Sequence, residues 1–164
     1  GAPFSVRLPP VTETKRLVPA PGAMPSGAME ILYASLPRLD GLSVLIVDDE
    51  TESRRMLESA LKGLGAEPSS AASAEEALSY LEGRTPDVLL CDLAMPGTDG
   101  YAFIRAVRER SPEKGGDVPA AALTTQTRVE DRTQLLMAGY QMYLPKPVDP
   151  AELAAAVKAL ARRR

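Results

Sequence analysis

Five short apolar runs, each followed by a segment with helical spacing of its apolar residues, fill the chain from residue 42 to residue 161. The runs predict strands over 44–47, 66–71, 87–92, 118–123 and 140–144, and the segments between them predict helices over 56–64, 73–81, 101–110 and 128–138 and from 149 onward. Strands that alternate with helices favour a parallel sheet with right-handed crossovers and helices on both faces. The sequence predicts a doubly wound, five-stranded α/β fold of the (βα)5 type.

Local signals support three of these elements. Pro68 cannot donate a hydrogen bond to a central ladder, so the second strand is predicted at an edge of the sheet. Ser73 and Glu76 have the spacing of a capping box at the start of a helix. Asp149 followed by Pro150 predicts an N-cap and a proline at the first helical position of the last helix.

The first forty residues differ in composition from the rest of the chain. Seven of the 15 prolines lie before residue 41, among mostly small residues. This composition favours an extended, weakly packed chain. We expect a proline-rich leader or linker over 1–40 and one compact domain over 41–164, a length that suits a single hydrophobic core.

The composition excludes several classes of function. The chain has no histidine, which excludes histidine metal ligands, Ser-His and Cys-His nucleophile pairs, and a phosphohistidine on this chain. A net charge of -3 gives no electrostatic reason to expect binding of nucleic acid. No apolar run approaches the ~18 residues of a membrane span, so we expect no membrane contact by this segment.

The chain has one cysteine, Cys91, so no disulfide can form within it. On a strand, Cys91 points to the face opposite that of Asp92, and a buried apolar thiol is its expected role. A chain without disulfides fits a reducing compartment, and we expect a cytoplasmic location.

Polar residues stand at the ends of four predicted strands. Asp48 and Asp49 follow the first strand, Asp92 ends the third, Thr124 follows the fourth and Lys146 follows the fifth. The carboxyl ends of parallel strands share one edge of a sheet, so these side chains are predicted to meet in one pocket. Crowded carboxylates need a cation, and Mg²⁺ suits hard oxygen ligands and also binds phosphate oxygens. The pocket predicts phosphoryl transfer.

Each part of this set has a simpler explanation when it is taken alone. Asp48 and Asp49 could form no more than a turn after a strand, and Asp92 could be a turn residue before Met95 and the proline that follows it. Coincidence becomes a poor explanation when Lys146 also follows its own strand, in the order that a single pocket requires. We interpret the residues as one site.

Residues 42–161 resemble the receiver domain of two-component response regulators. The resemblance is carried by VDDE at 47–50, DLAMP at 92–96 with DG at 99–100, ALT at 122–124 and YLPKP at 143–147. Any one of these motifs is weak, but four in order, each at a predicted strand end, are specific. The resemblance implies a flavodoxin-like receiver fold with the strand order 2-1-3-4-5.

The resemblance also implies roles for the acidic residues. Asp92 is then the nucleophile that takes a phosphoryl group from a phosphohistidine and forms an acyl phosphate. Asp49, Asp92 and the backbone carbonyl of Ala94 are the implied ligands of Mg²⁺, or of Mn²⁺ in its place, with Asp48 acting through water. A metal ion offsets the repulsion between a carboxylate and an anionic phosphoryl group.

Three further residues receive implied roles. Lys146 would contact one phosphoryl oxygen with its positive charge, and Thr124 would contact another with its hydroxyl. Thr124 would then move toward the phosphoryl group while Tyr143 turns inward as the aromatic partner of this switch. A tyrosine that half covers the sheet edge is the simpler alternative for Tyr143. For the bond between Lys146 and Pro147 the resemblance implies cis, whereas the sequence alone favours trans.

Residues beside the pocket modify these expectations. Thr125 stands where the family more often has a smaller residue, which predicts narrower access to the phosphoryl site. Ala94 and Gln126 are predicted to flank the path of the hydrolytic water, with Gln126 orienting the water and Ala94 leaving its path open. Because Ala94 is not an aspartate, the acid-base partner that an aspartyl-phosphate phosphatase needs two residues past Asp92 is missing.

The first nine residues, GAPFSVRLP, resemble the closing strand of a histidine-kinase ATP-binding domain. With the linker that follows, they favour the C-terminal receiver of a hybrid sensor histidine kinase. Two alternatives stay open: a response regulator whose output domain is absent from this sequence, and a receiver-like interaction module that is not phosphorylated.

The partner implied by the resemblance is a histidine kinase or phosphotransfer protein that carries phosphohistidine. The chain would then be a phosphoacceptor that assists its own phosphorylation and dephosphorylation. Homodimers through the last helix and strand are common in this family, although nothing in the sequence requires one.

Overall fold

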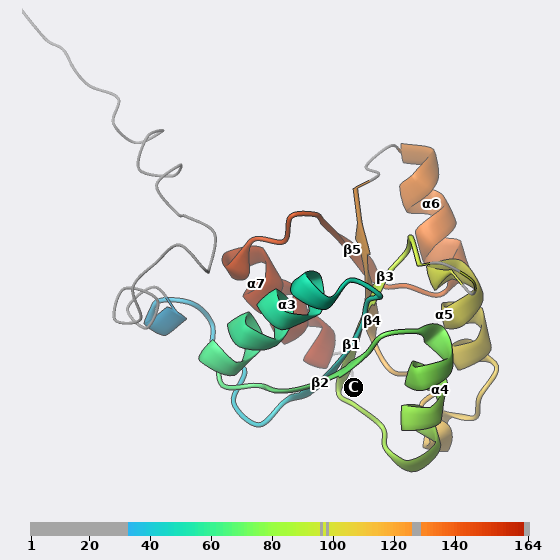
Figure 1. The fold of residues 1–164 in the computed structure, drawn as a ribbon, viewed down its shortest axis with the longest axis horizontal. Helices are drawn as coiled ribbons and strands as arrows, with labels where there is room; N and C mark the ends of the chain where they lie inside the picture. Colours follow the sequence, from blue (N-terminus) through green and yellow to red (C-terminus); the bar gives the residue numbers. More distant parts are fainter. Residues whose placement is uncertain (1–32, 96, 98, 126–128, 163–164) are drawn as a thin grey trace, which may run out of the picture.

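The structure is a computed structural model that describes residues 33–95, 97, 99–125 and 129–162. Within these residues, five parallel strands form one sheet at the centre of the domain (Figure 1). Their order is β2-β1-β3-β4-β5, with bounds β1 Ser43–Val47, β2 Glu67–Ala71, β3 Val88–Asp92, β4 Ala120–Thr124 and β5 Met142–Pro145. The predicted doubly wound sheet and its strand order are confirmed.

Helices cover both faces of the sheet, as Figure 1 shows. One face is covered by α3 (Thr51–Gly63) and α7 (Pro150–Ala161). The other is covered by α4 (Ala74–Gly83), α5 (Gly100–Arg108) and α6 (Val129–Ala138), and a short 3-10 helix, η2 (Pro112–Lys114), precedes β4. Among the described helices, none is both long enough and apolar enough to cross a bilayer.

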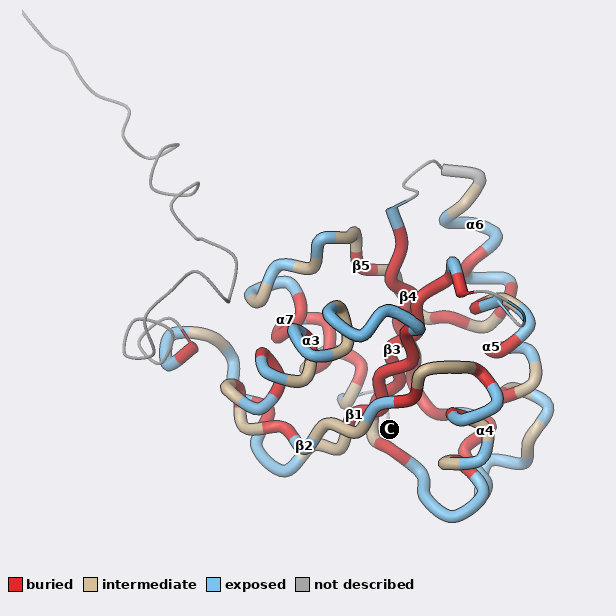
Figure 2. The backbone as a smooth tube through the Cα atoms, viewed as in Figure 1, coloured by how far each residue is buried: buried red, intermediate tan, exposed pale blue. Residues whose placement is uncertain are grey.

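Alternate residues of the central strands pack into separate cores on the two faces. Val44 and Ile46 of β1 pack with α3 and α7, whereas Leu45 and Val47 pack with α4 and α5. All four side chains are buried, and Figure 2 shows that burial is concentrated along the central strands. Because both faces are covered, the strands are apolar up to their carboxyl ends, where the polar residues begin.

The edge strand and the first cap agree with the sequence. Pro68 lies in the edge strand β2, in register with Val44. Ser73 Oγ accepts a hydrogen bond from Glu76 N at 3.1 Å, and Glu76 Oε1 accepts one from Ala72 N at 2.7 Å. The predicted capping box is confirmed at its Ser73 half, and the return bond goes to Ala72 N instead of Ser73 N.

Several elements begin at different residues from those predicted: β4 begins two residues later, at Ala120, and further differences concern α3 and β5. Helix α3 begins at Thr51 instead of residue 56, because its polar first turn carries no apolar periodicity. The prediction of a strand over 140–144 is wrong at its start, since β5 begins at Met142. Tyr140 N donates to Leu135 O at 3.2 Å and belongs to the turn after α6. Its ring is buried although it lies in the turn. The apolar run in the sequence therefore starts two residues before the strand does.

The chain already packs on the domain before residue 41. Tyr33 is 5% exposed and Leu39 is 0% exposed, and both belong to the core shared by α3 and α7. Leu39 N donates to Leu64 O at 2.8 Å. The ring of Tyr33 lies directly on Gly63, where an added Cβ would collide with it. The packed domain includes at least residues 33–40 of the predicted leader.

Candidate functional site

The carboxyl ends of four strands meet at one edge of the sheet. Asp48 directly follows β1, Asp92 ends β3, Thr124 ends β4 and Lys146 directly follows β5. Asp92, Thr124 and Lys146 line one cavity of about 290 Å³, while Asp48 and Asp49 join Asp92 in an acidic cluster. The structure brings together all five polar residues that the sequence placed at strand ends.

The acidic cluster consists of Asp48, Asp49 and Asp92. A carboxylate oxygen from each residue lies within 4.8 Å of those from the other two. Asp48 is 0% exposed and Asp92 is 6% exposed, whereas Asp49 is exposed to solvent. Negative charges this close repel one another strongly where water is excluded, so the cluster requires positive charge nearby.

Lys146 supplies part of that positive charge. Its Nζ lies 3.3 Å from Asp92 Oδ2 and 3.6 Å from Asp48 Oδ2. Burial lowers the pKa of Lys146, but the negative charges of Asp48 and Asp92 outweigh burial, so the pKa lies above its ordinary value. Lys146 is thus a charged ammonium at neutral pH, held between two carboxylates.

Backbone N–H groups fix the orientation of both buried carboxylates, and Arg54 holds the main chain at Asp48. Asp48 Oδ1 accepts a hydrogen bond from Glu50 N at 2.9 Å, and Arg54 Nη1 donates to the Asp48 carbonyl at 2.8 Å. Asp92 Oδ1 accepts a hydrogen bond from Ala94 N at 3.1 Å. In each carboxylate one oxygen is bound by a main-chain N–H, while the other faces Lys146.

The same cluster fits a divalent metal ion. Asp48 Oδ2 is buried and accepts no hydrogen bond from the described residues, and 3.6 Å to Lys146 Nζ is too long for one. A buried carboxylate oxygen of this kind is costly unless a cation lies close to it. Carboxylate oxygens are hard ligands, which suit Mg²⁺ or Mn²⁺.

The segment that carries Lys146 is held at both ends. Lys146 N donates to Thr124 O at 2.9 Å. Asp149 Oδ2 accepts two backbone N–H bonds at 3.1 Å, so the predicted N-cap of α7 is confirmed. The peptide bond between Lys146 and Pro147 is cis, as the family resemblance implied, and the trans expectation from sequence alone is wrong.

The cavity beside Asp92 contains residues that the sequence analysis did not assign to the site. Tyr101 and Asp99 line it together with Ala94 and Thr125. Asp99 also caps α5 by accepting a hydrogen bond from Ala102 N at 2.9 Å; the spacing of an acidic residue before a helical segment was the available signal. Gln126, which was predicted to orient the hydrolytic water, lies outside the described residues.

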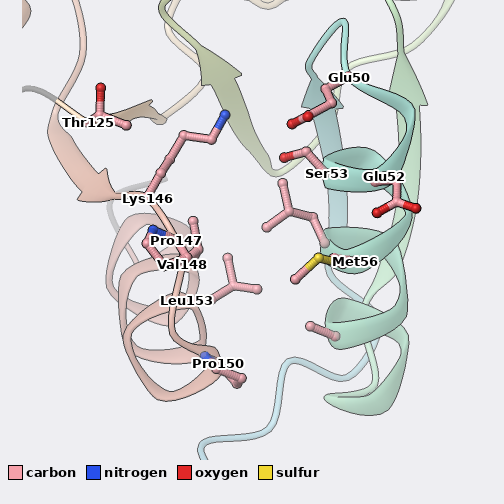
Figure 3. A pocket seen from close by; sticks show the side chains of 12 residues that line it. Glu50, Glu52, Ser53, Met56, Thr125, Lys146, Pro147, Val148, Pro150 and Leu153 are labelled. Atoms are coloured by element: carbon pink, nitrogen blue, oxygen red, sulfur yellow. The ribbon is translucent and has the colours of Figure 1, made fainter. Parts of the chain in front are cut away.

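A second cavity, of about 390 Å³, adjoins the first and shares Thr125 and Lys146 with it. We call this second cavity the α3–α7 groove. Figure 3 shows side chains from two walls around it, with Ser53 and Met56 on α3 and Val148 and Leu153 on the opposite side. Met56, an apolar residue of the helical spacing that predicted this helix, is 41% exposed in the groove. The groove is a mostly apolar surface that ends at the site.

Tyr143 lies on β5, two residues before the position paired with Thr124. In the register, Tyr143 pairs with Ala122. Its side chain is half-buried against the core on the α5 side, and Arg132 Cζ lies 5.8 Å from the ring centroid, within the range of a cation–π contact. In this conformation Tyr143 half covers the sheet edge. An inward turn would take its ring out of this position.

Known proteins match the chain in sequence. The response regulator receiver domain matches residues 44–158. An uncharacterized 14.6 kDa protein of Leptolyngbya boryana is 46% identical over 112 residues, which are 68% of this chain and 84% of that protein. The probable transcriptional regulator ycf27 of Porphyridium aerugineum is 39% identical over 120 residues, which are 73% of this chain but 48% of that regulator. The chain spans about half the length of the transcriptional regulators that it matches.

Solved structures match the fold. A putative response regulator from Chloroflexus aurantiacus superposes with a TM-score of 0.70 at 39% identity, covering 76% of this chain and 100% of that one. The receiver domain of sensor histidine kinase PA1611 from Pseudomonas aeruginosa has a TM-score of 0.68 at 32% identity, covering 74% of this chain and 98% of that one. The PA1611 structure contains a magnesium ion coordinated in its active site cleft.

Proposed function

Because the chain belongs to the response regulator receiver domain family, we propose that it accepts a phosphoryl group on Asp92 in a two-component phosphorelay. One observation carries the proposal: Asp92 Oδ2 lies 3.3 Å from Lys146 Nζ while the Asp92 carboxylate is also part of an acidic cluster. A carboxylate attacks an anionic phosphoryl group poorly unless positive charge offsets the repulsion. The position of Asp92 combines a fixed ammonium with a place for a metal ion.

We propose Mg²⁺, or Mn²⁺ in its place, as the metal ion. Asp49 and Asp92 would bind it with the backbone carbonyl of Ala94, and Asp48 would hold it through water. When bound, such an ion neutralises carboxylate and phosphoryl charge and aligns the reacting oxygens. The orphaned oxygen of Asp48 and the magnesium ion of the PA1611 receiver domain support this assignment.

In the transfer, an Asp92 oxygen forms a bond to phosphorus as the bond from phosphorus to the donor's imidazole nitrogen breaks. The electron pair of the broken bond stays on that nitrogen, and the imidazole leaves as neutral histidine because its other ring nitrogen carries a proton throughout. Lys146 neutralises one phosphoryl oxygen, and Thr124, which lines the same cavity, donates its hydroxyl to another. Lys146 acts in place, because its backbone N–H is bound to the Thr124 carbonyl.

Thr124 and Tyr143 form the proposed output switch. Contact between the Thr124 hydroxyl and the phosphoryl group would leave space behind Thr124, and Tyr143 would turn inward to fill it. Tyr143 would then leave its contact with Arg132 on α6, so the exposed surface of α6 and β5 would change. Phosphorylation would bias this two-state element by local charge and packing.

Residues at the cavity mouth tune the lifetime of the acyl phosphate. Ala94 and Thr125 are exposed and line the cavity. We propose that Ala94 leaves a path for the hydrolytic water and that Thr125 narrows access. Gln126 stays a predicted orienting group for that water, so Gln126→Ala should alter the decay rate of the acyl phosphate, and an unchanged rate would refute its role.

The phosphodonor is proposed to be a histidine kinase or phosphotransfer protein that docks a helix in the α3–α7 groove. The groove shares Lys146 and Thr125 with the Asp92 cavity, so a helix seated there presents a phosphohistidine directly to Asp92. The exposed side chain of Met56 gives this surface an adaptable apolar contact. A homodimer through α7 and β5 is a separate proposal.

We propose that residues 41–164, with residues 33–40 packed on them, form the receiver domain and that the residues before 33 link it to another part of a longer protein. Relatives in the family include transcriptional regulators and the receiver of a sensor histidine kinase. The resemblance of residues 1–9 to a kinase ATP-binding domain favours the hybrid-kinase context. A cytoplasmic location fits a chain whose one cysteine is buried and free.

Metal binding and phosphate uptake together test the proposed function. Calorimetry measures Mg²⁺ affinity, and phosphate-affinity electrophoresis after incubation with acetyl phosphate measures acceptance. Wild type should accept phosphate only with Mg²⁺, and Asp49→Asn should weaken Mg²⁺ binding by at least about tenfold. Asp40→Asn is the matched control, since Asp40 forms an exposed ion pair with Arg38 far from the cluster. A wild-type chain that neither binds Mg²⁺ nor takes up phosphate would instead be an interaction module.

A further inference from the structure

Tyr140 makes a buried hydrogen bond to the start of another helix. It lies in the turn between α6 and β5 and is 2% exposed. Its hydroxyl donates to the backbone carbonyl of Gly100, the first residue of α5, at 2.7 Å. The two residues are far apart in sequence, so this bond ties the turn after α6 to the N-terminus of α5.

Gly100 in turn packs against the main chain of the proposed phosphoacceptor. Gly100 N donates to Leu93 O at 3.1 Å. An added Cβ on Gly100 would lie 2.8 Å from the Asp92 carbonyl oxygen and 2.8 Å from Leu93 Cα, a separation that side chains do not tolerate. The backbone of Gly100 is therefore held in direct contact with the end of β3.

A second contact reaches the same carbonyl from Cys91. The Cys91 thiol donates to the Asp92 carbonyl at 3.3 Å and lies beside the Tyr140 hydroxyl. Burial raises the pKa of Cys91 to about 12, so the thiol stays protonated and can act as a donor. Tyr140 thus contacts both groups that support the Asp92 main chain.

We propose that Tyr140 is a positioning residue for phosphoryl acceptance at Asp92, an inference that rests on the proposed function. The segment between β3 and α5 carries Ala94 and Asp99, both of which line the Asp92 cavity. One end of this segment is anchored in β3, and the other is anchored at Gly100 by the Tyr140 hydroxyl. Loss of that hydroxyl removes its bond to the buried Gly100 carbonyl and lets the Gly100 end move.

The test compares Tyr140→Phe with Tyr80→Phe. Both variants lose one phenolic hydroxyl, but the Tyr80 hydroxyl contacts Ser69 Oγ at 3.4 Å, away from the cluster. Amide hydrogen exchange in metal-free protein reports directly on the Gly100 N–H. The half-saturating Mg²⁺ concentration, taken from isothermal titration calorimetry on the folded protein, and the initial rate of phosphate uptake report on the site.

In Tyr140→Phe we expect faster exchange at Gly100 and a half-saturating Mg²⁺ concentration roughly threefold to tenfold above that of wild type. The maximal rate at saturating Mg²⁺ should change much less, because the reacting groups are unaltered. Tyr80→Phe should match wild type in all three measurements. A half-saturating concentration belongs to the folded molecules alone, so partial destabilisation does not imitate the expected shift.

The inference would be overturned if Tyr140→Phe had the wild-type exchange rate at the Gly100 N–H and the wild-type half-saturating Mg²⁺ concentration. The proposed phosphoryl acceptance at Asp92 would not be affected by that result. Failure of the wild-type chain to bind Mg²⁺ or take up phosphate would instead remove the proposed function, and the inference with it. If Tyr140→Phe does not fold, Cys91→Ala provides the second variant, because it removes the other support of the Asp92 carbonyl. A smaller shift in the same direction is expected there, and an unchanged Mg²⁺ requirement would contradict the proposed support.

Discussion

Lys146 Nζ and Asp92 Oδ2 lie 3.3 Å apart although they stand at the ends of β5 and β3, with β4 between these strands. No local segment could hold this pair, because 54 positions of chain separate Asp92 from Lys146. The parallel sheet places both at the same edge, and the backbone bond from Lys146 N to Thr124 O fixes the approach of the lysine. The fold creates the charge arrangement of the site.

Replacement of this lysine should make stability depend on metal. Lys146→Met leaves Asp48 Oδ2 buried without a neighbouring ammonium. In metal-free buffer we expect the free energy of unfolding to fall by about 1–3 kcal/mol, a range that allows for the partial exposure of the lysine to solvent. Added Mg²⁺ should restore more stability to Lys146→Met than to wild type. Urea titrations with and without Mg²⁺ measure both effects. Lys62→Met, on the exposed face of α3, is the control; equal metal responses in both variants would contradict the role of Lys146.

Much of this site could be predicted because its polar residues stand at the ends of apolar strand segments. Asp48, Asp92 and Lys146 each interrupt or follow an apolar run, and parallel strands bring such positions together. The α3–α7 groove could not be predicted in this way. Met56 has the same apolar character as the core residues around it, and only the packing of α7 against α3 determines which side chains remain exposed.

Thr124→Ala should separate phosphate uptake from the output change. The variant keeps Asp92 and Lys146, so it should still accept a phosphoryl group from acetyl phosphate. It lacks the hydroxyl that draws β4 toward the phosphoryl group, so the phosphorylation-dependent change in hydrogen exchange of α6 and β5 should disappear. Thr85→Ala, at an exposed position, is the control and should respond like wild type. A full exchange response in Thr124→Ala would remove the switch assignment.

Arg108 should contribute strongly to stability. Its guanidinium donates to the Gly139 carbonyl at 2.8 and 2.9 Å, to the Gly116 carbonyl at 3.0 Å and to Gln141 Oε1 at 3.2 Å. Burial lowers the pKa of Arg108, although the group remains charged. Arg108→Met should cost about 2–4 kcal/mol in chemical denaturation, since these acceptors lose their donors.

The same site distinguishes a guanidinium from a simple positive charge. Arg108→Lys should recover only part of the loss, because an ammonium cannot span the separated carbonyls. Arg105→Lys, exposed on the same helix, should stay within about 0.5 kcal/mol of wild type. Full stability in Arg108→Lys would show that charge alone is sufficient.

Leu39 tests the packing of the residues before β1. Its side chain is 0% exposed in the core shared by α3 and α7, so Leu39→Ala should cost about 2–5 kcal/mol. Leu136→Ala, at a position that is 56% exposed, should change stability by less than about 0.5 kcal/mol. Equal, small effects in both variants would mean that residues 33–40 do not pack on the domain in solution.

The fold was more predictable from sequence than its boundaries were. The core strands and Pro68 at the edge follow from periodicity and from the chemistry of proline. Tyr33 and Leu39 were assigned to a linker because the prolines around them dominate local composition, and their burial depends on α3 and α7, which are distant in sequence. Tyr140 was assigned to a strand because it lies just before the apolar residues of β5. A buried residue in that position looks the same in the sequence whether it packs in the sheet or in the turn before it.

The most direct test is the chemical identity of the modified residue. Protein incubated with Mg²⁺ and acetyl phosphate is reduced with borohydride, which traps an aspartyl phosphate, and peptide mass spectrometry locates the modified position. We predict a single modified site at Asp92, with none in Asp92→Asn or in chelator. Wild type that stays unmodified with Mg²⁺ present, or that carries its modification at a residue outside the Asp92 cavity, would contradict the proposed phosphoacceptor.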